Sequence, residues 1–136
     1  MSQENVEVMR RAFEGLNARS AEAMEQLCAP DGEWRPVLTA GGDLEHPVYR
    51  GPAGMVQYWT DLDELFEGTE VHVEELEPIG PDHVLFSGRV TARGRKSGVP
   101  LDERIWAIWE LRDGRLLRGT AYRSRVDALE AVGLRE

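Results

Sequence analysis

The sequence predicts an α+β fold in which three N-terminal helices pack on an antiparallel sheet. Apolar residues recur at helical spacing in the first half of the chain, whereas strand-like alternation fills the second half. The dipeptide Asp113-Gly114, between two alternating runs, predicts a tight hairpin because such a turn needs positive φ angles. Helices followed by a series of hairpins are typical of a sheet that is covered by helices on one face.

The three predicted helices have recognisable ends. Ser2 can cap the first helix and Ser20 the second, because a serine hydroxyl accepts a hydrogen bond from a free backbone N–H in the first turn. We expect Pro30-Asp31-Gly32 to end the second helix, Pro52 to open the third and Gly68 to end it. The apolar stripes are Val6, Met9, Phe13 and Leu16; Ala23, Met24, Leu27 and Cys28; and Met55, Trp59, Leu62 and Phe66.

The predicted strands follow from alternation and turn signals. Pro36 marks an edge or a bulge in the first of them, and an irregular segment returns from Asp43 to Tyr49. Turn residues at 78–82 and a basic loop at 94–100 separate the later strands. The strands are expected over 33–39, 69–77, 83–93, 101–111 and 115–124, and a terminal helical turn over 126–132.

Composition indicates one folded domain over residues 1–136. Apolar residues make up 41% and charged residues 30%, with a formal net charge of −9 from 25 acids and 16 bases. Such a surface repels phosphate backbones and anionic membranes, so we expect neither nucleic acid nor a membrane as a partner. The acidic N-terminus lacks a secretion signal, and a lone Cys28, expected to be a small core residue, fits a reducing cytoplasm.

Three motifs carry a resemblance to a known family. They are the opening of the third helix, Tyr49-Arg50-Gly51-Pro52, the hairpin from Trp109 to Arg115, and the tail from Arg125 to Ala131. In this order they resemble the small bacterial SnoaL-like proteins of the nuclear transport factor 2-like superfamily, which includes ketosteroid isomerases and polyketide cyclases. The resemblance covers nearly the whole chain. It implies a cone-shaped fold whose curved sheet wraps around one apolar pocket, with no cofactor.

Two catalytic sets of the superfamily are not retained. The ketosteroid isomerases need a base and two donors that hold an enolate, and the matching positions here hold side chains that cannot do this. The limonene epoxide hydrolases need an Asp-Arg-Asp set, of which only the arginine is kept, at Arg89. The positions that match the isomerase set are Pro36, Ala12 and Ala107, and those that match the lost carboxylates are Thr91 and Ala121.

A SnoaL-like cyclase needs an acid/base group beside an apolar pocket, and Glu103 and His46 are the candidates. Glu103 shares a strand face with Ile105, Ala107 and Trp109, where desolvation would raise its pKa. The alternative is that Glu103 lies near the open end of its strand and pairs with an arginine. His46 lies before Pro47 and is either at the pocket mouth or solvated. Other free candidates are Glu33 and Asp43, whereas His72 and His83 have no neighbour at metal-ligand spacing, so no metal site is expected.

Aromatic residues are expected to form the walls of the pocket, although ordinary core packing explains each of them singly. Gly119 and Ala121 leave room opposite these large side chains, which favours a cavity. Arg89 and Arg123 are candidate anchors, but Arg89 belongs to the outer face if Val84, Phe86, Val90 and Ala92 face the helices. The expected walls are Trp34, Tyr49, Trp59, Phe66, Phe86 and Trp109.

The strand at 101–111 is apolar on both faces, which predicts a homodimer through the outer sheet face. The expected contact residues are Arg104, Trp106, Ile108 and Tyr122. The alternative is that Trp106 and Tyr122 are half-covered surface aromatics. The function expected first is binding of a small hydrophobic molecule, with cyclase-, isomerase- or dehydratase-type proton transfer; the alternative is a non-catalytic binding or dimerisation module.

Overall fold

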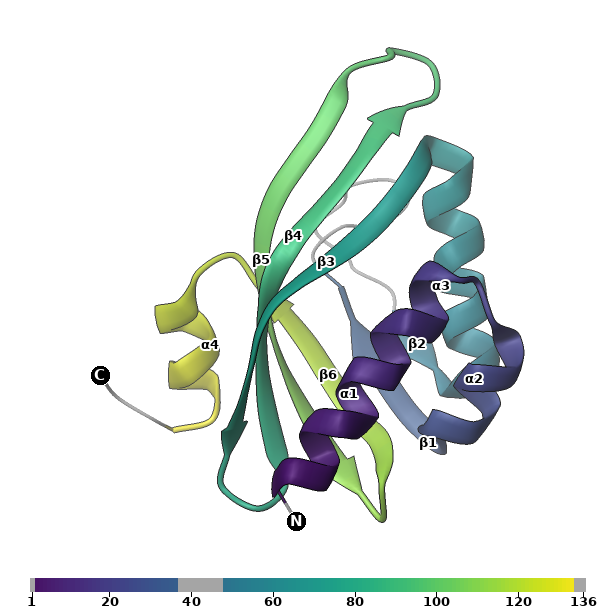
Figure 1. Cartoon of the computed structure of the whole chain (residues 1–136). Coiled ribbons are helices and arrows are strands. Elements are labelled where there is room, and N and C mark those ends of the chain that lie inside the picture. Colours follow the sequence, from purple (N-terminus) through teal and green to yellow (C-terminus); the bar gives the residue numbers. More distant parts are fainter. Residues whose placement is uncertain (1, 37–47, 134–136) are drawn as a thin grey trace.

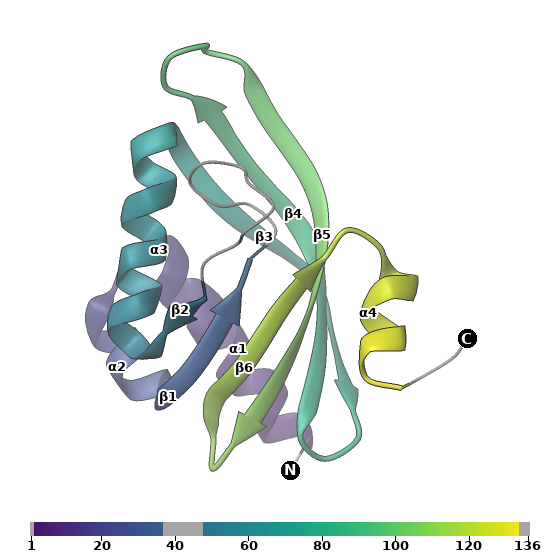
Figure 2. The same ribbon diagram turned by 180° about the vertical axis from the view of Figure 1, so that it is seen from behind.

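The computed structural model describes residues 2–36 and 48–133, and it has the predicted α+β architecture. Helices α1 (Ser2–Asn17), α2 (Ala21–Leu27) and α3 (Gly51–Leu65) cover one face of a curved sheet (Figure 1). A further helix, α4 (Arg125–Ala131), lies against the opposite face (Figure 2). The strands are β1 (Cys28–Arg35), β2 (Tyr49–Arg50), β3 (Phe66–Ile79), β4 (His83–Gly94), β5 (Pro100–Arg112) and β6 (Arg115–Tyr122).

The six strands form one sheet in the order β2-β1-β6-β5-β4-β3. From β3 to β6, successive strands pair antiparallel, as the hairpin pattern predicts. The strand β1 pairs parallel with β6, so the sheet is mixed and not wholly antiparallel. The short β2 and the long β3 therefore form the two edges.

The second helix and the first strand meet without a turn, contrary to the expectation that 30–32 ends a helix. Helix α2 ends at Leu27, and Pro30 to Gly32 lie inside β1. The register of β1 with β6 shifts between Cys28 and Glu33, so these residues form an irregular, bulged part of the strand. The strand is described as far as Arg35, and the predicted continuation over 37–39 lies outside the described residues.

Gly68 was expected to end the third helix, and this is wrong. Helix α3 ends at Leu65, where the Phe66 N–H donates to the Leu62 carbonyl oxygen. Gly68 lies in β3 with a φ of 67°, beside a register shift between Glu67 and Glu70. Its positive φ therefore serves a bulge in an edge strand rather than a helix end.

Two local expectations are confirmed. The Ser20 hydroxyl accepts from the Ala23 N–H at 3.1 Å and caps α2. Asp113 and Gly114 have φ angles of 53° and 74°, as a tight hairpin turn between β5 and β6 requires.

The larger hydrophobic core lies between α1–α3 and the sheet, and Cys28 is buried in it as expected. A second cluster lies under α4 on the other face and includes Leu85, Ile108 and Leu129. Of the helices that the structure describes, none has the length and apolar character needed to cross a membrane.

Candidate functional site

The larger core contains a cavity of about 50 Å³ between the helices and the sheet. This volume is room for roughly three to five water molecules. Helices α1 and α3 form one side of the cavity, and β1, β3, β4, β5 and β6 form the other. The lining residues are Met9, Ala12, Phe13, Leu16, Asn17, Arg19, Trp34, Met55, Tyr58, Trp59, Leu62, Thr69, Val71, Phe86, Val90, Ile105, Ala107, Trp109 and Leu116.

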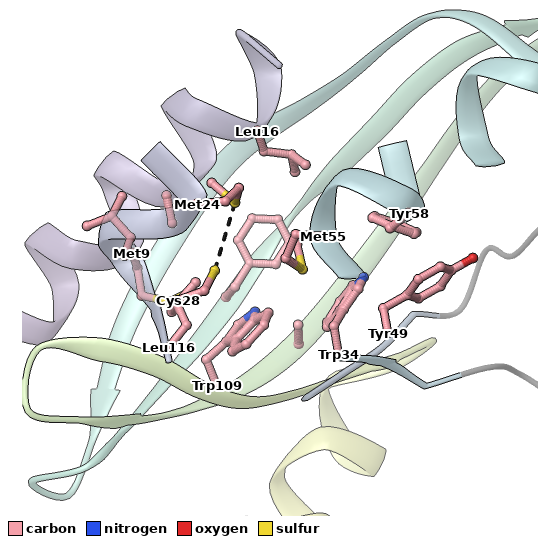
Figure 3. Close-up of a cluster of buried hydrophobic side chains, with 14 of the residues drawn as sticks. Met9, Leu16, Met24, Cys28, Trp34, Tyr49, Met55, Tyr58, Trp109 and Leu116 are labelled. Atoms are coloured by element: carbon pink, nitrogen blue, oxygen red, sulfur yellow. Dashed lines mark hydrogen bonds between the residues drawn. The ribbon is translucent and has the colours of Figure 1, made fainter. Parts of the chain in front are cut away.

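Two stacked tryptophans form the wall of the cavity on the sheet side. The rings of Trp34 and Trp109 lie 5.2 Å apart at an interplanar angle of 12°. Figure 3 shows both indole nitrogens turned away from the strands that carry the two residues. Gly119 is the register partner of Trp109, and a methyl group at this position would overlap the Trp109 ring. The glycine is therefore required for the indole to lie flat on β6.

Helix α1 contributes a third aromatic contact. Phe13 stacks on Phe86 of β4, with ring centroids 4.5 Å apart and an interplanar angle of 25°. This contact fixes the position of α1 over the sheet, because stacked aromatic pairs add to the free energy of burial. The same side of β4 carries Val90, so the inner face of this strand is apolar.

Polar residues lie at the end of the cavity beside the α1–α2 turn. Arg19 donates to both carboxylate oxygens of Asp63, at 3.2 and 3.0 Å, and also to the carbonyl oxygens of Leu16 and Thr69. Asn17 exchanges two hydrogen bonds with the backbone of Val71, at 2.8 and 2.9 Å. Because these partners use most of the donors of Arg19, and both the oxygen and one N–H of the Asn17 amide, the two side chains mainly hold the turn against β3.

Three buried polar atoms in the cavity wall lack a hydrogen-bond partner in the described part of the chain. They are Nε1 of Trp34, Nε1 of Trp59 and Oγ1 of Thr69. The three residues are only 7%, 5% and 7% exposed, so water outside the protein does not reach these groups. An unsatisfied buried donor costs about 1–3 kcal/mol. The wall is therefore apolar in area but carries unused hydrogen-bonding capacity.

Tyr58 lies between the aromatic wall and α3. Burial raises the pKa of its hydroxyl to about 12, so the group is protonated at neutral pH. The Trp34 N–H and the Arg19 charge act in the opposite direction, although this N–H makes no hydrogen bond of acceptable geometry. The Trp34 and Tyr58 rings lie edge to face at 5.9 Å, which offers the N–H at most a weak contact with the ring.

Six aromatic residues were expected to form the walls. The structure brings Trp34, Trp59, Phe86 and Trp109 together around the cavity. Tyr49 lies in a small adjoining recess, packs against Tyr58 at 5.3 Å and donates to Asp61 at 2.6 Å. Phe66 is half-buried at the edge of the core and does not line the cavity.

The expected acid/base and anchor residues lie outside this lining. Glu103 is opposite Val90 on the inner face but is exposed and lies outside the cavity lining. Phe86 and Val90 face the core, so Arg89 lies on the outer face, where it pairs with Asp102 at 2.9 Å. Arg123 is exposed just past β6.

The remaining charged candidates are also accounted for. Glu33 pairs with Arg50 at 2.7 Å and Arg35 at 3.1 Å, and these hydrogen bonds hold its pKa below the usual range. His46 and Asp43 lie outside the described residues. Within residues 2–36 and 48–133, no group of three or more His, Cys, Asp or Glu side chains is close enough to hold a metal ion.

The sequence-based list of wall residues omitted Tyr58 and the α1 residues Met9 and Phe13. Tyr58 follows Met55 by three positions and precedes Leu62 by four, so the helical spacing would have placed it on the inner face. The sequence correctly places Met9 and Phe13 on the apolar stripe of the first helix, but an apolar stripe by itself does not reveal that the helix borders a cavity.

A curved sheet with helices on its inner face around an apolar cavity defines the nuclear transport factor 2-like class of folds. The SnoaL-like domain model matches residues 9–119, and the chain therefore belongs to the SnoaL-like family. No curated protein sequence matches the chain.

Several solved structures have this fold at low sequence identity. A nuclear transport factor 2-like protein of Burkholderia pseudomallei has a TM-score of 0.76 at 14% identity, over 96% of each chain. IdmH, a putative polyketide cyclase from Streptomyces antibioticus, has a TM-score of 0.71 at 21% identity, over 96% of this chain and 99% of its own. TerC, co-crystallised with polyporic acid, has a TM-score of 0.76 at 21% identity, over 96% of this chain and 98% of its own.

Proposed function

We propose that this protein binds a compact, mainly apolar organic molecule in the cavity between α1, α3 and the sheet. The observation that carries the proposal is the space left inside a core rich in large aromatic side chains, opposite small residues such as Ala107 and Ala12. Close packing is the rule in protein interiors, so a cavity of several water volumes favours an occupant. The co-crystal of TerC with polyporic acid supports binding of an organic molecule on this fold.

Ligand-induced stabilisation tests the proposal. At a ligand concentration ten times the Kd, binding should raise the free energy of unfolding by about 1.4 kcal/mol. We expect cyclohexanone to raise the melting temperature measured by circular dichroism. Ala107→Val, which fills the cavity from β5, should remove this effect, whereas the same change at the exposed Ala131 of α4 should leave it intact. Equal stabilisation of the two variants would contradict binding in this cavity.

Acid–base catalysis is the second candidate, of the cyclase, isomerase or dehydratase kind. It is supported by the position of Glu103 on the strand face that carries Ile105, Ala107 and Trp109, and by the fold of the putative cyclase IdmH. Because Glu103 is exposed and outside the cavity lining, a substrate would have to extend beyond the cavity to meet it. His46 and Arg123 are the other proposed contributors, whereas Arg89, on the outer face, is not one of them.

Turnover by variants distinguishes the two candidates once a substrate is found by screening. If Glu103 is the acid/base, Glu103→Gln should lower kcat by at least 100-fold, since general acid–base catalysis contributes about 10²–10⁴-fold. Glu130→Gln on α4, an exposed carboxylate on the other side of the sheet, is the matched control. Unchanged kcat in Glu103→Gln would remove Glu103 from the mechanism and leave the binding function.

A further inference from the structure

We propose that the indole N–H groups of Trp34 and Trp59 recognise a hydrogen-bond acceptor on the ligand. The cavity then selects a compact neutral molecule with an oxygen acceptor over a hydrocarbon or an amine of the same shape. This inference rests on the proposed function, because it requires that the cavity binds a ligand. It adds what the apolar character of the walls does not specify, namely the polar chemistry of the occupant.

The two indole nitrogens belong to residues of the cavity wall and make no hydrogen bond within the described part of the chain. Both belong to residues at least nine-tenths buried, on separate elements, β1 and α3, and neither makes a hydrogen bond of acceptable geometry among the described residues. The Trp34 N–H is near enough to the Tyr58 hydroxyl to act on its pKa, so a ligand acceptor at Trp34 would also lie beside this hydroxyl. Trp34 is held by its stack on Trp109, and Figure 3 shows its nitrogen directed away from β1, on the side where Met55 and Tyr58 lie. A side chain packed in this way keeps its N–H in a fixed direction.

The chemistry of indole decides what the partner must be. An indole N–H donates one hydrogen bond and accepts none, so only an acceptor can satisfy it. The described lining contains no carboxylate, and its one amide side chain, that of Asn17, is bound to Val71. The Thr69 hydroxyl, the third unpartnered group, can also donate. A ligand that brings an acceptor would remove the desolvation cost that these groups carry in the free protein.

The size of the cavity limits the ligand. A volume of about 50 Å³ is smaller than the several hundred Å³ typical of sites for drug-sized molecules. Room for roughly three to five waters suits a short chain. A single ring fills a cavity of about 150 Å³ in other proteins, so a ring requires the flexible side chains of Met9 and Met55 in the lining to move aside. Arg19 at the cavity end is paired with Asp63, so the lining offers no free charge that would require an ionised ligand.

Two probes of equal shape, together with a charged amine of similar size, test the inference. Cyclohexanone carries a carbonyl oxygen where methylenecyclohexane carries a methylene group, and cyclohexylamine replaces the acceptor with a charged donor. Without hydrogen bonds, methylenecyclohexane should bind most tightly, because its transfer out of water is the most favourable. If the two N–H groups donate hydrogen bonds to the carbonyl oxygen, we expect cyclohexanone to bind at least fivefold more tightly than methylenecyclohexane. Cyclohexylamine should bind most weakly.

The indole N–H signals provide a direct readout. The chain has four tryptophans, so a ¹H–¹⁵N spectrum of the protein has four such signals, which Trp→Phe variants assign. Cyclohexanone should move the Trp34 and Trp59 signals downfield, as hydrogen bonding does, and leave that of Trp106 on the outer face unchanged. Methylenecyclohexane should move the two inner signals much less.

Affinities of variants complete the test. Trp34→Phe and Trp59→Phe should each lower the ratio of the cyclohexanone affinity to the methylenecyclohexane affinity toward one. Because these two probes have the same shape, a change in cavity size affects both affinities alike and cancels in the ratio. If Trp34→Phe does not fold, Trp59→Phe and the wild-type spectra still decide whether the indole N–H groups donate to the carbonyl oxygen.

Each outcome has a defined meaning. Equal affinities in the wild-type protein, or a cyclohexanone preference retained in both variants, would overturn this inference and leave the proposed function standing. If neither probe binds and no inner indole signal moves, the proposed function fails and the inference fails with it.

Discussion

Cys28 shows how one buried group couples folding to pH. The residue is 4% exposed at the start of β1, and its sulfur lies 3.9 Å from that of Met24. Burial, with a smaller effect of the Glu25 charge, raises the pKa of the thiol from 9.0 to about 11. The folded protein therefore holds this proton more tightly than the unfolded chain does.

The sign of the pH dependence follows from this shift. Below pH 9 both states are protonated, and the contribution of Cys28 to stability is complete. Between pH 9 and 11 the unfolded chain releases the proton first, so the free energy of unfolding should fall. We expect the loss to be about 2 kcal/mol across this window. Urea denaturation at a series of pH values measures it.

Cys28→Ala is the matched variant for this measurement. It lacks the thiol, so its free energy of unfolding should fall less between pH 9 and 11, and the difference from the wild-type protein isolates Cys28 from Tyr58. Parallel pH profiles of the two proteins would show that the thiol ionises equally easily in both states, contrary to the prediction.

At the scale of the element, two glycines in the β5–β6 hairpin have different roles. Gly119 lies under the Trp109 ring, whereas Gly114 has a φ of 74° and open space around it. Gly119→Ala should lower the free energy of unfolding by about 1–3 kcal/mol through overpacking. Gly114→Ala should cost roughly 1 kcal/mol through backbone strain. Urea denaturation gives both values.

Near-UV circular dichroism separates the two effects. Only Gly119→Ala should change the tryptophan signal, because only this change displaces Trp109 from its stack on Trp34. An altered tryptophan spectrum in Gly114→Ala, or an unaltered one in Gly119→Ala, would refute this assignment.

The elements also show which local signals in the sequence were decisive. Asp113-Gly114 predicted a hairpin correctly, because a tight turn between alternating runs has few alternatives. Gly68 and Pro30 were misread as helix ends, since glycine and proline mark bulges as well as helix termini. The choice between a helix end and a strand bulge depends on strand pairing in the folded protein, where β1 and β3 begin directly after α2 and α3.

The site was predictable only in part for a similar reason. Strand alternation correctly indicated that Trp109 and Phe86 face the helices, because the period of a strand fixes the face. It carried no information on which part of that face other elements cover, so it did not reveal that Glu103 is exposed while Ile105 lines the cavity. The unpartnered donors depend on distances between elements and have no signature in the sequence.

At the scale of the whole molecule, the homodimer through the outer sheet face stays a prediction. Helix α4 covers Ile108 within the chain, so this residue is not available to a partner. Arg104 is exposed, and Trp106 and Tyr122, which pack in part against the α4 cluster, are half-buried; the Arg104 guanidinium lies 5.1 Å from the Trp106 ring. Sedimentation equilibrium should give twice the chain mass of 15.3 kDa.

Trp106→Glu tests the proposed dimer face, because a carboxylate at the centre of an apolar contact is costly to bury. This variant should sediment as a monomer with an unchanged helical circular dichroism signal. Val99→Glu in the exposed β4–β5 loop is the control and should remain dimeric. A wild-type protein that is monomeric at high concentration would contradict the prediction.

The two hydrogen bonds between Asn17 and Val71 have a consequence for the behaviour of the chain in a crowded solution. Strand β3 is an edge of the sheet, and an edge with free N–H and C=O groups invites pairing with a strand of another molecule. The Asn17 amide occupies both backbone groups of Val71, as a neighbouring strand would. The last residue of α1 thus protects the edge strand at this point against edge-to-edge aggregation, in addition to its position at the cavity.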